Sequence, residues 1–176
     1  MTSTEIKDYF KEQIPTMDKP SIMAFLQNQM EASMEVTAHF QIEFSEVLGE
    51  HIYPSFKTIL EHIYLHHDVM EPVLENWDVY HIVEAAMSKI YELWQKENYA
   101  VAEKLAQAVI ESFTPGITAM DTPEKNYTAC YLRLMLFIKN RIHNSNNPEE
   151  KKYAQALYNI IKNSESMQPL LHQLSD

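Results

Sequence analysis

The sequence has few of the residues that β-sheets, disulfide-stapled folds or membrane spans require. Only two glycines, Gly49 and Gly116, occur in 176 residues, which leaves little turn chemistry for β-hairpins. A single cysteine, Cys130, excludes an internal disulfide. No stretch approaches the roughly 18 uninterrupted apolar residues of a membrane-spanning helix. These absences predict an all-α protein that makes no membrane contact.

Positive charge is also scarce. Fourteen Lys and Arg stand against 25 Asp and Glu, a formal net charge of -11 at pH 7, which repels nucleic-acid phosphates and anionic lipids. We therefore expect no direct nucleic-acid binding. Met1 is followed by polar Thr2, Ser3, Thr4 and Glu5 instead of the basic and apolar segments of a signal peptide, so we expect a cytoplasmic protein.

The most regular pattern in the chain lies between Trp77 and Phe113. Apolar residues recur there at three- and four-residue steps in two runs, which is the spacing of amphipathic helices. Only the four residues 95–98 separate the runs, so the two helices must return antiparallel as a hairpin. The runs are Val83, Ala86, Met87, Ile90, Tyr91 and Trp94, followed by Tyr99, Ala102, Leu105, Ala106, Val109, Ile110 and Phe113.

Capping residues followed by proline indicate further helix starts. They are Asp18 before Pro20, Thr122 before Pro123, and Asn147 before Pro148. The helix that opens after Asp18 either continues to Gly49 or breaks near Ser33. Residues 40–48 alternate in part like a strand, but their flanks are helical and no partner strand is available, so we predict a helix there.

The chain therefore reads as one all-helical domain over residues 1–176, with eight or so helices. Residues 1–18 form an N-terminal arm in this interpretation. Residues 77–163 follow the order helix, short turn, helix, longer link, helix, short turn, helix, which is typical of stacked antiparallel hairpins.

The segment from Met87 to Val109 resembles a tetratricopeptide unit. Tyr99, Ala102 and Ala106 stand where that repeat has its second-helix aromatic and small packing residues, and residue 115 supplies a proline near the repeat's closing proline. No glycine follows the leucine position of the first helix, and the helices of the next hairpin are longer than those of the repeat. The resemblance implies a tetratricopeptide-like array that binds a peptide or protein partner on a concave helical surface.

A second resemblance extends over more of the chain. Leu74 to Tyr80, Pro123 to Tyr127 and Glu149 to Tyr158 are similar in order to the C-terminal domain of Rgg-type peptide-pheromone regulators. Those proteins read a short secreted peptide on a tetratricopeptide-like superhelix and signal to an N-terminal DNA-binding helix-turn-helix. The N-terminal segment here is acidic, too short and without that motif. The resemblance therefore implies a peptide-sensing regulatory domain without its DNA-binding part, either a fragment of a longer regulator or a free-standing sensor.

Amide, aromatic and cationic side chains along the hairpins suit contacts to an extended peptide. The expected peptide- or partner-binding residues are Trp94, Asn126, Tyr127, Arg133 and Asn140. Turn and cap chemistry is an equally available role for asparagine, and we assign it to residues 98, 144, 146 and 147. Because helical stacks commonly leave an apolar flank exposed, a homodimer is our expectation for assembly.

Metal binding is the main alternative. His62 and His66 are four residues apart and so share one helix face, with Glu61 as a nearby carboxylate. A solvated helix end explains the same residues, and neither the paired Glu-x-x-His of di-iron bundles nor His-Glu-x-x-His occurs. We assign no metal and no cofactor, and read this trio as the candidate for a metal- or small-molecule-binding bundle.

Catalytic motifs are missing from the sequence. There is no Gly-rich phosphate loop, no Gly-x-Ser-x-Gly and no Ser-x-x-Lys, so we expect no enzyme activity. Cys130 lies among apolar residues and is interpreted as a buried, inert thiol. A further hypothesis, based on the charge of -11 alone, is an acidic antagonist that occupies a basic partner protein.

Overall fold

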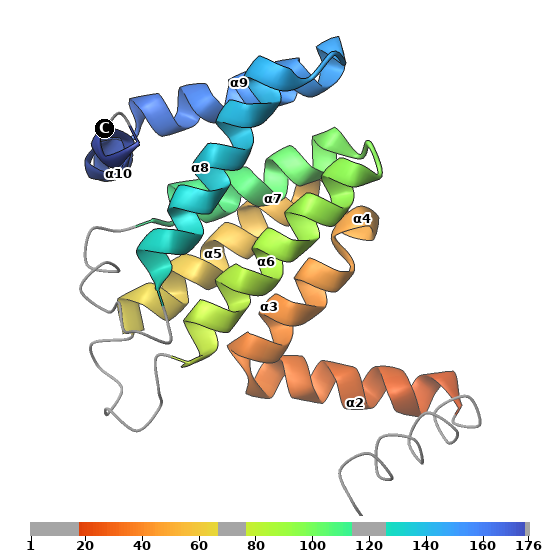
Figure 1. Ribbon diagram of the computed structural model, residues 1–176. Helices are drawn as coiled ribbons and strands as arrows, with labels where there is room; N and C mark the ends of the chain where they lie inside the picture. The colour runs from red at the N-terminus through yellow and green to blue at the C-terminus, as the bar shows by residue number, and fades with distance from the viewer. Residues whose placement is uncertain (1–17, 67–76, 114–125, 175–176) are drawn as a thin grey trace, which may run out of the picture. The chain divides into compact units, whose positions relative to one another are not determined.

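Helices make up nearly all of the described chain. The structure, a computed structural model, describes residues 18–66, 77–113 and 126–174, with only the backbone described for 64–66 and 77–79. No strand occurs among these residues, which confirms the all-α prediction, including the helix expected over 40–48. The elements (Figure 1) are α2 (Lys19–Ala32), α3 (Met34–Glu43), α4 (Ser45–Leu48), η2 (Gly49–His51), α5 (Ile52–His66), α6 (Trp77–Gln95), α7 (Tyr99–Glu111), α8 (Tyr127–Asn144), α9 (Pro148–Asn163), η4 (Glu165–Met167) and α10 (Gln168–Gln173).

Two of the predicted cap-and-proline helix starts are confirmed. At the start of α2, the Asp18 carboxylate accepts a hydrogen bond of 3.0 Å from the amide of Ser21. At the start of α9, Asn147 Oδ1 accepts from the amides of Glu149 at 2.9 Å and Glu150 at 3.3 Å. Each side chain satisfies backbone donors that the helix itself leaves without partners.

The third predicted start is wrong for α8. This helix begins at Tyr127, and Asn126 is its N-cap, with Oδ1 accepting from the amide of Ala129 at 2.7 Å. The backbone of Asn126 is extended (φ -112°, ψ 90°), so no helix that started at Pro123 runs through it. Thr122 and Pro123 lie outside the described residues. Two good capping residues stand four positions apart, and the one closer to the apolar run caps the helix.

The chain divides into two compact units, residues 1–37 and 38–176. In the first, α2 ends at Ala32 and its C-cap Ser33 has an extended backbone, so of the two alternatives the break near Ser33 is the one observed. The Ser33 hydroxyl accepts from the amide of Val36 at 3.3 Å and so helps to open α3, while the Thr37 hydroxyl donates to the carbonyl of Met30 at 2.8 Å. No residue of α2 is buried.

Antiparallel hairpins stack in the second unit, as expected for residues 77–163. The α6–α7 hairpin turns at residues 96–98, where Glu97 takes a left-handed backbone conformation (φ 60°), and α8 and α9 form the next hairpin. Helix α7 packs against α5, α6 and α9, and α6 also packs against α8 (Figure 1). Helices α5, α7 and α9 thus form one row, and α6 and α8 form another. Helix α10 packs on α8 and α9.

The core is centred on α7. Ala102, Leu105, Ala106, Val109 and Ile110 are all completely buried because helices pack on several sides of α7. Burying a side chain the size of valine, leucine or isoleucine stabilises the fold by about 1.5 to 3 kcal/mol relative to exposure. None of the described helices combines the length and apolar character that a membrane crossing needs.

Candidate functional site

The best candidate for a functional site lies where α6 and α8 pack together. We call it the α6–α8 seam, and it contains Tyr80, Glu84 and Tyr91 from α6 and Cys130, Arg133 and Phe137 from α8. Residues 80, 84 and 91 share one side of α6, because steps of four and seven return to the same face of a helix. The seam therefore brings titratable and aromatic side chains of two successive hairpins together.

Polar contacts in the seam centre on Arg133. Its Nη2 donates to the sulfur of Cys130 at 3.1 Å and lies 3.6 Å from Oε1 of Glu84, which also accepts from the hydroxyl of Tyr80 at 3.1 Å. Both contacts of Arg133 use the same nitrogen, although a guanidinium has five N–H donors, and sulfur is a weak acceptor. The side chain of Arg133 is 56% exposed. It is therefore a cation that faces solvent with only loose internal partners.

Two titratable groups of the seam, Tyr80 and Cys130, have raised pKa values. Burial raises the pKa of Tyr80 to about 12, and the nearby Cys130 and Glu84 contribute to the same shift. Burial also raises the pKa of the Cys130 thiol, outweighing the hydrogen bond from Arg133 that lowers it. A thiol needs a depressed pKa to be reactive near neutral pH. The prediction that Cys130 is buried is confirmed, and its surroundings suppress the thiolate.

Aromatic rings continue the seam away from Arg133. The centres of the Tyr91 and Phe137 rings are 4.7 Å apart, and the indole of Trp94 meets the Phe137 ring edge-on at 5.5 Å. The guanidinium of Arg141 lies 4.8 Å from the centre of the Phe137 ring. Tyr91 and Phe137 are half-buried, so their edges form part of the surface. Such rings offer apolar contact area to a bound chain.

Two of the predicted binding residues, Arg133 and Asn140, share one exposed face of α8. They are seven residues apart, and Leu136, 53% exposed, lies on the same face. Asn126 is exposed but precedes the helix as its N-cap, so the helical spacing does not extend to it. The side-chain oxygen of Asn140, Oδ1, accepts a hydrogen bond of 2.6 Å from the side-chain amide of Asn144. Asn126 is occupied in part by its capping bond. The structure thus places a cation, an exposed leucine and an amide in line on α8.

The other two predicted binding residues lie beneath this face. Trp94 and Tyr127 are buried, and both belong to the apolar sides of their helices. The indole N–H of Trp94 donates to Glu150, and the ring of Tyr127 meets that of Tyr80 edge-on at 5.5 Å. Their observed roles are in the core that supports the seam. Both residues belong to the apolar helical pattern, which predicts burial in the core and not contact with a ligand.

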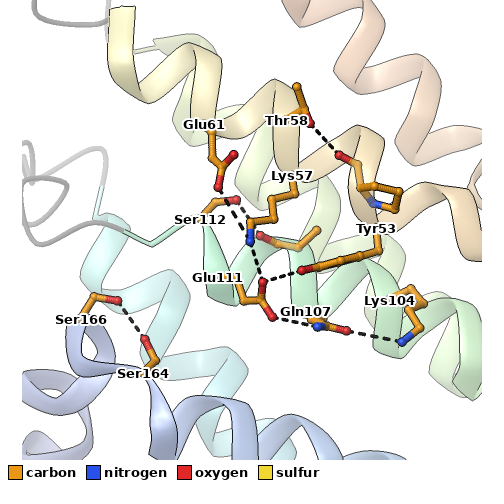
Figure 2. A network of polar contacts seen from close by, with 12 residues as sticks. Tyr53, Lys57, Thr58, Glu61, Lys104, Gln107, Glu111, Ser112, Ser164 and Ser166 are labelled. Carbon is orange, nitrogen blue, oxygen red and sulfur yellow. Dashed lines mark hydrogen bonds and ion pairs between the residues drawn. The ribbon is translucent and has the colours of Figure 1, made fainter.

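A second polar network joins the other row of helices (Figure 2). Both Tyr53 and Lys57 of α5 donate to Oε2 of Glu111 on α7, at 2.6 and 2.7 Å, and Gln107 donates to Oε1 at 2.8 Å. Lys104 extends the network to Gln107 at 3.4 Å. Burial alone would raise the pKa of Glu111, but these donors outweigh it and hold the pKa below its usual value. A carboxylate so fully engaged acts as a clamp between α5 and α7.

The sequence did not predict this network. Tyr53 and Lys57, like Gln107 and Glu111, are four residues apart and so share a helix face, which is the only local signal present. Which two faces meet depends on how the hairpins stack, and the pairing spans more than fifty residues.

The predicted metal trio is only partly described. Glu61 is 3.8 Å from Lys57 in an ion pair, His62 is exposed on α5, and the side chain of His66 lies outside the described residues. Within the described part of the chain, no group of three His, Cys, Asp or Glu residues is placed to hold a metal ion. A metal site that includes His66 stays a prediction.

No protein-family model, curated protein or solved structure matches this chain. Function is therefore inferred from the fold and from the contacts described above.

Proposed function

We propose that this protein is a non-catalytic binding module that recognises a peptide or protein partner on the outer surface of α6 and α8. We define this α6–α8 face as Arg133, Leu136 and Asn140 with the exposed edges of Tyr91 and Phe137. The observation that carries the proposal is the alignment of an exposed leucine with a loosely paired arginine and an amide, next to half-buried rings. Arginine and aromatic residues are enriched where protein interfaces gain their binding energy.

The state of the titratable groups favours binding over chemistry. The seam tyrosine and thiol have raised pKa values, and the Glu111 carboxylate is saturated by three donors. A general base must be able to take a proton near neutral pH, and a nucleophile needs such a base beside it. These groups support a module that has no reaction of its own.

The location of the α6–α8 face on two hairpins also favours a regulatory role for such a module. The α6–α8 face spans two successive hairpins, so a peptide that contacts both α6 and α8 contributes free energy that depends on how the hairpins pack. A ligand shifts a conformational equilibrium only through such a difference in affinity between two states. The resemblance to peptide-sensing regulators is consistent with this proposal, as a domain without a DNA-binding part.

A selection from a random peptide library tests the proposal, because it requires no known ligand. The full chain is immobilised, binders are selected from the library, and each is titrated in solution by fluorescence anisotropy. Leu136→Ala and Arg133→Ala should each weaken binding by tenfold or more, about 1.4 kcal/mol. Lys104→Ala, which changes a residue on the other row of helices, is the matched control and should bind as the wild type does.

Separate variants distinguish ligand contacts from structural roles. Asn126→Asp keeps a capping acceptor at the start of α8 while it removes the amide, so a loss of binding without a loss of stability indicates a ligand contact. A selection that yields no binder, or binders that are insensitive to both Leu136→Ala and Arg133→Ala, would contradict the proposed face.

A further inference from the structure

The helical stack formed by the described residues 38–66, 77–113 and 126–174 has ends of opposite charge. Residues 38–66, which contain α4 and α5, carry four glutamates and a single lysine. Residues 126–174, which contain α8, α9 and α10, carry six Lys and Arg against three glutamates. The second group is thus cationic although the whole chain has a net charge of -11. We call these two groups the acidic end and the basic end.

The two ends lie on different sides of the α6–α7 hairpin. Helix α5 packs on α7 from one side, whereas α8 packs on α6 and α9 packs on α7 from the other (Figure 1). Within a stack, each hairpin has neighbouring hairpins on both sides except at the two ends. The net charge therefore changes from negative to positive along the stack, from α5 to α9.

Exposed apolar side chains mark each end. At the acidic end, Val47 is 82% exposed and Phe44 is 45% exposed, and exposed Glu43 and Glu46 adjoin them in sequence. At the basic end, the exposed Leu136 lies one helical turn from Arg133. Glu46 is ion-paired with Lys96 at 3.3 Å, and Arg133 lies 3.6 Å from Glu84. Each end thus combines an apolar contact with a net charge, and the two net charges are opposite in sign.

We propose that the acidic end of one copy of this chain docks on the basic end of a second copy, head to tail. The net charge of -11 repels two copies in every orientation, and the pairing of the acidic end with the basic end offsets part of this repulsion. Because the two surfaces are different, the contact is heterologous and leaves one end of each kind uncovered. Association consequently continues beyond the dimer as the protein concentration rises.

This contact shares Leu136 with the α6–α8 face, so a bound peptide and a second copy compete there; the docking itself does not depend on peptide binding. That competition would link the proposed sensing role to the state of assembly. The acidic end contains no residue of the α6–α8 face, which allows the two proposals to be tested apart.

Sedimentation velocity of two blocked variants tests the pairing. Val47→Lys disables the acidic end and Leu136→Glu disables the basic end; both positions are exposed, so thermal unfolding should match that of the wild type. The wild type should show concentration-dependent species larger than a dimer at about 50 mM NaCl that diminish at about 500 mM, where screening is stronger. Each variant alone should be monomeric, and an equal mixture should form a one-to-one dimer through the two intact ends.

Gln27, an exposed residue of α2, provides the matched controls. Gln27→Lys and Gln27→Glu introduce the same charged residues outside both the acidic and the basic group and should associate as the wild type does. Peptides selected on the full chain should still bind Val47→Lys, so a failure of docking is distinguishable from a failure of the proposed function. A wild type that stays monomeric, or a mixture of blocked variants that stays monomeric, would overturn the head-to-tail contact.

Discussion

The indole N–H of Trp94 donates a hydrogen bond of 2.6 Å to Oε1 of Glu150, joining α6 to the first turn of α9. The other carboxylate oxygen accepts from the hydroxyl of Ser145, and Nε of Arg141 lies 3.5 Å from Oε1. Glu150 is only 8% exposed. One buried carboxylate therefore ties the α6–α7 hairpin to the α8–α9 hairpin, close to the turns of both.

Removing this carboxylate should destabilise the fold. Glu150→Ala leaves the buried indole N–H and the Ser145 hydroxyl without their acceptor, which should lower the free energy of unfolding by about 2 to 3 kcal/mol. Urea denaturation followed by circular dichroism measures the change. Glu149→Ala alters the neighbouring exposed residue of the same helical turn and should cost much less. Equal losses in the two variants would show that the carboxylate contributes only through the helix terminus.

Acid should remove the stabilisation that Glu111 provides. Its pKa in the folded state is depressed by Lys57, Tyr53 and Gln107, so the folded protein binds this proton less readily than the unfolded chain does. The resulting stability is fully present above the usual carboxyl value of 4.5 and is lost as the pH falls through the lower, folded-state pKa. The difference in unfolding free energy between wild type and Glu111→Gln should therefore shrink as the pH is lowered from 7 to about 3.

Titration of Lys57 does not contribute to this pH dependence between pH 7 and about 3. Its hydrogen bond to Glu111 raises the pKa of the lysine, so the ammonium stays charged throughout the acidic range and its own contribution fades only at high pH. Glu61→Gln, which changes a more exposed partner of the same lysine, is the control and should cost less stability than Glu111→Gln at pH 7. A pH-independent difference for Glu111→Gln would refute a charged clamp.

Local rules were sufficient to predict the helices. The starts at Asp18 and Asn147 depend on a side chain and backbone amides within three residues, and the α6–α7 hairpin depends on apolar spacing and a four-residue gap. The start of α8 was mispredicted because Thr122 and Asn126 are both good caps. The first residue of a helix was therefore predictable to within about one helical turn, as expected where two capping residues compete.

The site was less predictable because it depends on which faces meet. The seven-residue spacing of Arg133 and Asn140 indicates a shared face, but whether that face is exposed or buried is decided by the packing of α6 on α8. Trp94 illustrates the difficulty, since its aromatic ring suits a ligand as well as a core. Its partner Glu150 is 56 residues away, and no local pattern connects the two.

Ser45 is a buried polar residue that the fold leaves unsatisfied. Its hydroxyl is the one buried side-chain polar atom, among the residues described, that lacks a hydrogen-bond partner. Burying a hydroxyl without a partner costs free energy that an apolar replacement avoids. Ser45→Ala should therefore raise the free energy of unfolding by about 1 kcal/mol in the same urea titration.

Ser55→Ala is the matched comparison and should change stability in the opposite direction. The Ser55 hydroxyl donates to the carbonyl of His51 at 2.8 Å and lies 3.1 Å from the side-chain oxygen of Gln41. Its removal should lower the free energy of unfolding by about 0.5 to 1.5 kcal/mol, the usual net value of a hydrogen bond. If both alanine variants are destabilised alike, the Ser45 hydroxyl has a partner in solution, such as a buried water, and the hydroxyl contributes to stability instead of opposing it.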